Sequence, residues 1–245
     1  RVILELAPEF APEHFKNIVK LAQNRYWDGL HILRVQDNYV VQWGFHGEKT
    51  TPALEKKMKG VDRRIKDEFE ASYTDNTPFF KLSDPDTYAP QTGFSYGFPV
   101  GRDPSQKKHW LTHCYGIVGI SRGSERDSAS AEGMYVVIGQ SPRHLDRNIT
   151  LVGRVVFGME LLSTLPRGKK EMGFYKNKKS FVPIRSLHLM SEVPKNKWTK
   201  IEILKTDSTT FAQWVESRRN RREKWFYRPA GAIEICNLNP PTRLY

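Results

Sequence analysis

Apolar residues alternate with polar ones at the start of the chain and then change to helical spacing. Val2, Leu4 and Leu6 occupy every second position, which predicts one face of a β-strand. Pro12 falls in the first turn of a predicted helix, where its missing N–H is tolerated. The apolar stripe of this helix consists of Phe15, Ile18, Val19 and Ala22. The chain is therefore expected to begin with a strand and an amphipathic helix.

A β-hairpin with one charged residue in it is predicted at 27–44. Two short runs, 30–35 and 39–43, are separated by a polar turn, and an Asp-Gly pair precedes them. Arg34 lies in the first run. Because a guanidinium keeps its proton, a half-buried arginine donates hydrogen bonds from a fixed fork, and Gln42 on the returning strand is placed to orient it. The hairpin has no nucleophile and no pair of carboxylates, which indicates chemistry by positioning and polarisation.

Further along the chain, apolar runs predict more strands than helices. Strands are expected at 116–121, 134–138 and 149–156, and closing strands at 184–190 and 200–204. Helices are expected as one turn at 52–58, as a short segment at 159–165, and from N-cap candidates at 206–208 through about Trp225. The tail from Pro229 is expected to lie along the surface.

The region from 70 to 109 has weak periodicity and is rich in proline, glycine, aspartate and aromatic residues. Long loops in compact domains are functional or mobile. The many aromatic side chains favour a loop that packs on the rest of the molecule, because a disordered linker would have fewer.

The chain of 245 residues carries a net charge of +12, which raises the question of an anionic partner. The simplest interpretation is a basic, solvated surface. The densest run, SRRNRREK at 217–224, is predicted on a helix, and acidic lipid headgroups, lipopolysaccharide or RNA would all suit it. No apolar run approaches the roughly 20 residues of a membrane helix, so no membrane span is expected.

The two cysteines leave two alternatives open. Cys114 and Cys236 have the spacing of neither a zinc site nor a redox motif. In an oxidising compartment they could pair; otherwise they are two ordinary buried thiols. The seven histidines show no metal-binding spacing, so neither a metal nor another cofactor is expected.

The hairpin at 27–44, WDGLHILRVQDNYVVQWG, resembles the signature of the cyclophilins, which are peptidyl-prolyl cis-trans isomerases. Further segments resemble the family in the same order: LTHCYGIVGISR at 111–122, EGMYVVIG at 132–139 and HLDRNITLVGRVV at 144–156. The chain is identified as a divergent member, bacterial-like, with a large insertion and a C-terminal extension. The resemblance implies a mainly β fold, a closed eight-stranded antiparallel barrel capped by two helices.

The resemblance also implies a division of the chain and a partner. A barrel domain is expected over 1–195, with the inserted loop region at about 70–109. A C-terminal extension with one helix and a tail, packed on the barrel, is expected over 196–245. The implied partners are proline-containing polypeptides. We expect a folding factor that is periplasmic or otherwise exported, with the cytoplasm as the alternative.

By resemblance, the site residues are those that act on an X-Pro bond. Arg34 is expected to donate a hydrogen bond to the prolyl nitrogen, and Gln42 to position it. The expected lining of the proline pocket consists of Tyr39, Val40, Tyr135 and Leu145. The residues expected to border the groove are Ser121 and Arg122. The expected substrate-binding set also includes His144 and Ile149.

Several positions depart from the family pattern. Gly133 stands where the family has a glutamine that binds the substrate backbone, and Ile149 where a histidine closes the pocket. His144 replaces an aromatic residue and Arg122 a frequent asparagine. Because these groups bind peptide, we expect a weakened or differently selective isomerase. One alternative is a catalytically silent module that binds a protein through 70–109 or the tail. The other is a nucleic-acid or anionic-surface binder.

Overall fold

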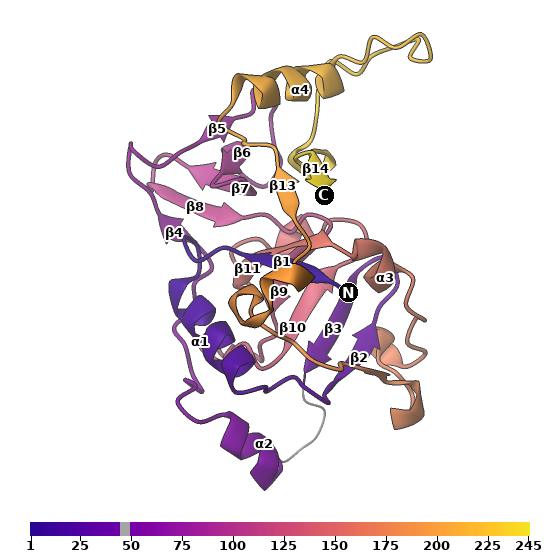
Figure 1. Ribbon diagram of the computed structural model, residues 1–245. Helices are drawn as coiled ribbons and strands as arrows, with labels where there is room; N and C mark the ends of the chain where they lie inside the picture. Colours follow the sequence, from indigo (N-terminus) through magenta and orange to yellow (C-terminus); the bar gives the residue numbers. More distant parts are fainter. Residues whose placement is uncertain (45–49) are drawn as a thin grey trace.

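A seven-stranded antiparallel sheet lies at the centre of the computed structural model, which describes residues 1–44 and 50–245 (Figure 1). Six of its strands are long enough to form a continuous ladder, and the seventh is a two-residue edge. In pairing order they are β1 (Ile3–Leu6), β11 (Leu151–Phe157), β9 (Ile117–Ile120), β10 (Met134–Val137), β3 (Val40–Gly44), β2 (His31–Val35) and β12 (Val182–Pro183).

The inner face of this sheet packs against the first helix. Val35 pairs with Val41, and Val41 with Val136, so these buried side chains project to the same face. Helix α1 (Pro12–Gln23) covers them with Ile18, Leu21 and Ala22. The predicted strand and helix at the start of the chain are confirmed. Residues at alternate positions, including Arg34 and Gln42, project from the opposite, outer face.

The expected closed eight-stranded barrel is not confirmed, because the predicted closing strands at 184–190 and 200–204 do not join the sheet as strands. The sheet forms a half-barrel with β1 and β12 at its ends. Pro183 has no N–H to donate, and beyond it Ile184 makes single bonds with the chain at Gly29 and Leu30. The segment predicted at 200–204 instead supplies β13 (Ile201–Ile203), which pairs with β14 (Thr242–Leu244) in a separate ribbon.

The region predicted as a packed loop does pack on the rest of the molecule, but it forms a second antiparallel sheet, so the prediction of a loop is wrong. Its strands are β4 (Ala71–Ser72), β8 (Lys108–Leu111), β7 (Phe98–Asp103), β6 (Gln91–Ser95) and β5 (Phe80–Lys81). β6 and β7 are joined by Tyr96 and Gly97, both with positive φ, as a tight hairpin turn requires. Tyrosine is an unusual residue at a position with positive φ, so the sequence did not predict this hairpin. The two-residue strands are too short to show alternation.

The second sheet covers part of the outer face of the first (Figure 1). Val40, Val137 and Leu151 of the first sheet share one buried cluster with Phe94 and Phe98 of the second. The inserted region therefore closes a second hydrophobic core over the face from which Arg34 projects.

The C-terminal segment packs on the inserted sheet. Helix α4 (Thr209–Arg219) is capped by Ser208, whose Oγ accepts a hydrogen bond from the Phe211 N–H at 3.1 Å. The Phe211 ring contacts Phe80 and Phe94 edge-on, at centroid distances of 5.1 and 5.0 Å. The helix ends before the predicted Trp225. Asn220 has non-helical backbone angles and ends the helix. A longer helix would bring the basic side chains of 218–222 next to one another at helical spacing.

A disulfide joins Cys114 to Cys236 across 122 residues. The residues beside Cys236, Ile235 and Leu238, are 1% exposed and belong to the second core. This part of the tail is therefore buried, contrary to the prediction that it lies along the surface. The disulfide resolves the two alternatives for the cysteines in favour of pairing.

Two short helices complete the structure. Helix α2 (Pro52–Lys57) is capped by Thr51, and helix α3 (Met159–Ser163) follows β11, as predicted. Within 1–44 and 50–245, no helix has both the length and the apolar character needed to cross a membrane.

His109 on β8 makes the stability of the inserted sheet dependent on pH. It is 3% exposed, its ring lies 4.7 Å from that of Phe10, and Arg102 pairs with it on β7. Burial, and then the charge of Arg102, lower the pKa of His109 from 6.5 to about 4. The unfolded chain therefore takes up this proton first, so stability is complete above the ordinary pKa and falls as the pH drops toward 4.

We expect this histidine to account for a loss of about 2–3 kcal/mol in unfolding free energy between pH 7 and pH 4.5. Urea unfolding of the native protein and of His109→Gln at both values measures it. The variant should lose less stability on acidification. An equal loss in the two proteins would contradict the prediction.

Candidate functional site

A row of side chains crosses the outer face of the central sheet. Arg34 on β2 pairs with Gln42 on β3, Gln42 pairs with Tyr135 on β10, and Tyr135 pairs with Gly119 on β9. Paired residues in antiparallel strands project to the same side, so these groups lie next to one another. Arg34 Nη1 donates a hydrogen bond to Gln42 Oε1 at 3.0 Å. The two residues predicted to act together are thus in direct contact.

The Arg34 guanidinium is enclosed by acceptors and aromatic rings and is 9% exposed. Nε donates to the backbone oxygen of Met172 at 2.6 Å, and Nη2 donates to Gln36 Oε1. The Arg34 Cζ lies 5.4 Å from the centre of the Tyr39 ring and 5.5 Å from that of Phe174. Burial lowers the pKa of Arg34 below its ordinary value. Hydrogen bonds to residues within 1–44 and 50–245 occupy three of its five N–H groups, which leaves two for a ligand.

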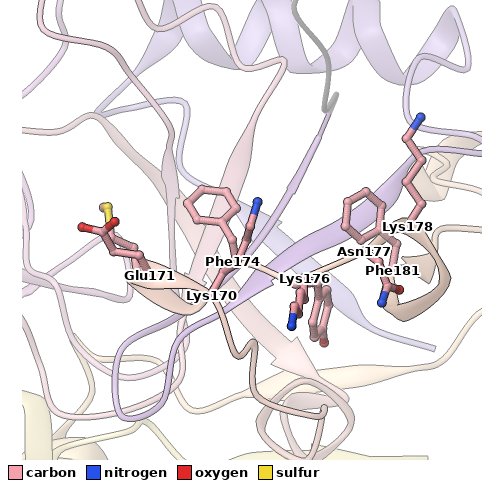
Figure 2. Close-up of a pocket in the computed structure, with 9 residues that line it drawn as sticks. Lys170, Glu171, Phe174, Lys176, Asn177, Lys178 and Phe181 are labelled. Carbon is pink, nitrogen blue, oxygen red and sulfur yellow. The ribbon is translucent and has the colours of Figure 1, made fainter.

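Residues 168–181, which we call the cover segment, lie along β2 and supply two of these contacts. The Gly168 N–H donates to Val35 O, and the Tyr175 N–H to Leu33 O, at 2.9 and 3.0 Å. These bonds bring Met172 and Phe174 onto Arg34. A cavity of about 440 Å³ opens along the segment, and Figure 2 shows its lining side chains. Its basic residues are Lys170, Lys176 and Lys178.

The hydroxyl of Tyr135 is at one end of a buried chain of hydrogen-bonded side chains. Tyr135 is 6% exposed, and its hydroxyl lies 3.0 Å from His113 Nε2. His113 Nδ1 in turn lies 2.8 Å from Asp146 Oδ1. A Cβ at position 119 would lie 2.3 Å from the tyrosine ring, so only glycine leaves room for it. Burial raises the pKa of Tyr135 well above its ordinary value, so the hydroxyl stays neutral.

The Asp146 carboxylate connects this chain to the inserted region. Arg143 Nε donates to Asp146 Oδ2 at 2.6 Å, and its terminal nitrogens donate to Asp86 at 3.0 Å. All three side chains are at most 6% exposed. A buried charge needs such partners, since an unpaired one is costly. The inserted region is thereby linked to Tyr135 on the central sheet through His113.

Three predicted pocket residues come together with Tyr135 in the second core. Val40 is 2% exposed, and Tyr39 and Ile149 are half-buried against the same cluster. These side chains belong to one apolar cluster, which we call the apolar wall, on the face of the sheet from which Arg34 and Gln42 project. Val40 is so well covered that it supports the wall from within.

Ser121 and Gly133 adjoin where β9 and β10 meet. The Ser121 N–H donates to Gly133 O at 2.9 Å. The Ser121 Oγ is buried and has no hydrogen-bond partner within 1–44 and 50–245. Such an atom is costly unless a ligand or water satisfies it. Ser121 is therefore a candidate contact for a bound peptide.

The other predicted groove residues are less closely connected to Arg34. Arg122 donates to the backbone oxygens of Asn148 and Gly123, at 2.9 and 2.8 Å. His144 is exposed and Leu145 half-buried, both on the 3₁₀ turn Arg143–Leu145. No hydrogen bond or ion pair found in the described part of the chain joins any of the three to Arg34.

Sequence reasoning missed five residues that contact Arg34 or belong to the hydrogen-bonded chain behind Tyr135. These are Gln36, Met172, Phe174, His113 and Asp146. Gln36 is two positions from Arg34, so the hairpin pattern could have identified it. Met172 acts through its backbone oxygen, which no pattern of side chains reveals. Over the described residues, no three His, Cys, Asp or Glu side chains are grouped so that they could bind a metal ion.

A family model and one solved structure agree on the fold. The family model described as "Cyclophilin type peptidyl-prolyl cis-trans isomerase/CLD" matches residues 1–189. A cyclophilin from Hirschia baltica has a similar structure, with a TM-score of 0.74 at 19% identity, covering 100% of this chain and 86% of that one. A cyclophilin-type isomerase from Cryptosporidium parvum, solved with the dipeptide Ala-Pro, scores 0.42 at 15% identity, covering 76% and 86%. No curated protein matches the sequence.

Proposed function

The chain belongs to the cyclophilin-type peptidyl-prolyl cis-trans isomerases, and we propose that Arg34 is the group through which it isomerises X-Pro bonds of protein substrates. Rotation about a peptide bond is opposed by about 18–20 kcal/mol, because the nitrogen lone pair is delocalised. For X-Pro the two isomers differ by only about 0.5–1 kcal/mol, so both are populated. A hydrogen bond to the prolyl nitrogen as it becomes pyramidal stabilises the twisted state over either planar state.

The Arg34–Gln42 contact carries this proposal. It places the permanently charged guanidinium of Arg34 on the same face as the apolar wall of Tyr39, Val40 and Ile149. Two of its N–H groups bond to none of the described residues. This wall suits the pyrrolidine ring. The buried Ser121 hydroxyl, for which the described part of the chain supplies no partner, suits the polar backbone of the preceding residues. The test is a protease-coupled assay of proline-containing peptides, comparing the native protein with Arg34 variants.

We further propose that the activity is reduced or altered in selectivity. The cover segment already engages Arg34 through Met172 O, and Arg122 donates to backbone oxygens. The same observation favours the second candidate function, a module that binds proline-containing segments without turnover. Peptide binding that Arg34→Ala weakens, with no rate above the uncatalysed one, would favour the silent module over the enzyme.

Gly133 offers a gain-of-function prediction. A Cβ there would lie 3.3 Å from the Ser121 Cβ, so the substitution requires the chain at Ser121 to move by a few tenths of an ångström. We expect Gly133→Gln to raise kcat/KM by about two- to tenfold, the value of one added hydrogen bond to the substrate backbone. The protease-coupled assay measures it, and Gly133→Ala separates the effect of the Cβ from that of the amide. A rise in the alanine variant alone would contradict the prediction.

The disulfide supports the proposal of an exported folding factor. Disulfides persist in oxidising compartments, such as the periplasm and the extracellular space, and are rare in the cytosol. Isomerisation of X-Pro bonds is a slow step that newly exported chains must complete. The division into a domain over 1–195 and an extension over 196–245 stays a prediction.

A further inference from the structure

The loop after α4 exposes two large aromatic side chains among positive charges. Within 1–44 and 50–245, Tyr227 and Trp225 are the most exposed large apolar or aromatic residues, at 95% and 79%. Figure 1 shows this loop, residues 220–232, projecting away from the body of the molecule. We call it the aromatic loop. Exposed aromatic side chains at a projecting tip are characteristic of interaction sites.

Both ends of the aromatic loop are fixed to the body by one carboxylate. Asp84, in the inserted region, accepts hydrogen bonds from Arg219 Nε at 3.2 Å and from the Ile233 N–H at 3.1 Å. Cys236 is held by the disulfide three residues later. At the tip, the Phe226 N–H donates to Glu223 O at 2.9 Å, which turns the chain between the two exposed rings. The loop is thus anchored at its base and presents Trp225 and Tyr227 outward.

Basic side chains surround this tip and its base. Arg222, Lys224 and Arg228 are exposed on the loop itself. At its base, a cavity of about 540 Å³ is lined by Arg218 and Arg228, among others. Neither of these two arginines forms an ion pair with any described residue. Their guanidinium groups are therefore available for a phosphate group.

We propose that the aromatic loop binds the surface of an anionic lipid bilayer. Tryptophan and tyrosine favour the headgroup level, where one end of the ring is apolar and the other is hydrated. Arginine and lysine beside them attract anionic headgroups. Single-stranded RNA, which also combines phosphates with bases that stack, is bound in grooves lined by aromatic side chains. Here the rings stand on a convex tip, which suits a flat surface.

The test is flotation with vesicles of phosphatidylcholine containing about a quarter phosphatidylglycerol, compared with phosphatidylcholine alone. We expect binding to the anionic vesicles only, and weaker binding at higher salt because exposed charges are screened. Trp225→Ala combined with Tyr227→Ala should weaken binding about tenfold. Arg222→Gln combined with Lys224→Gln should weaken it to a similar degree, about tenfold. All four side chains are exposed, so the variants should fold.

Matched control variants distinguish binding through the aromatic loop from binding through the overall positive charge of the protein. Lys56→Gln combined with Lys59→Gln removes the same charge in α2 and just beyond it, and α2 lies at the opposite end of the molecule (Figure 1). Tyr115→Ala removes an aromatic ring that is 39% exposed elsewhere. Both should change binding less than about twofold if the loop is the site. Equal losses in loop and control variants would overturn the proposal. So would binding of a single-stranded RNA oligonucleotide, abolished by the loop variants, without binding to vesicles.

Discussion

Arg34→Ala is expected to reduce kcat/KM for proline-peptide isomerisation by about 100-fold or more, similar to the loss of one preorganised donor in other enzymes. The guanidinium is the only permanently charged donor in the row formed with Gln42 and Tyr135. Arg34→Lys retains the charge but loses the planar fork, so it cannot serve Gln42, Met172 and the substrate together. We therefore expect the lysine variant to lose most of the activity as well.

The measurement is the protease-coupled assay, with circular dichroism and thermal unfolding to confirm that each variant is folded. Arg64→Ala serves as a matched control, because Arg64 is exposed and pairs with Asp127 on the surface. It should retain native activity. Full activity in a folded Arg34→Ala protein would remove Arg34 from the reaction and leave the family membership without a known catalytic group in this chain.

Removal of the disulfide is expected to produce the largest loss of stability. It closes a loop of 122 residues, and cross-links of this length restrict the unfolded chain strongly. Cys114→Ala combined with Cys236→Ala should lower the unfolding free energy by about 2–4 kcal/mol. Ile235 and Leu238 would then be the first core residues to become accessible, because the disulfide holds them against the second core. Urea unfolding measures the change.

A reductant provides the internal control for this prediction. It should lower the melting temperature of the native protein toward that of the double variant and leave the variant unchanged. If native protein and variant unfold at the same urea concentration under oxidising conditions, the disulfide does not stabilise the fold.

The central sheet could be predicted from the sequence because its strands follow simple rules. Residues 2–6 alternate, the hairpin has a recognisable turn and the other three strands are short apolar runs, and each of these signals corresponds to strands in the structure. The inserted sheet could not be predicted in this way. Its turn at Tyr96 has a residue that rarely adopts positive φ. Its buried character depends on α4, which begins only at Thr209, far beyond the last strand of the sheet.

The candidate site was predictable to the extent that it is local. Arg34 and Gln42 are eight residues apart across one hairpin, so their contact follows from the strand register. Met172 is 138 residues from Arg34, and its contribution is a carbonyl that every residue has. The basic run at 217–224 was recognised, but its helix ends at Arg219, which places three of its five basic residues in a loop.

The carbonyl of Met172 restricts how the properties of Arg34 can be changed. A side chain that blocks a guanidinium can be removed by one substitution, whereas a main-chain oxygen persists through every exchange at that position. The Arg34 guanidinium loses this hydrogen bond only if the backbone path of the cover segment changes, for example after a deletion between Gly168 and Phe174. Relatives with faster or slower turnover should accordingly differ here in the number of residues more than in their identity.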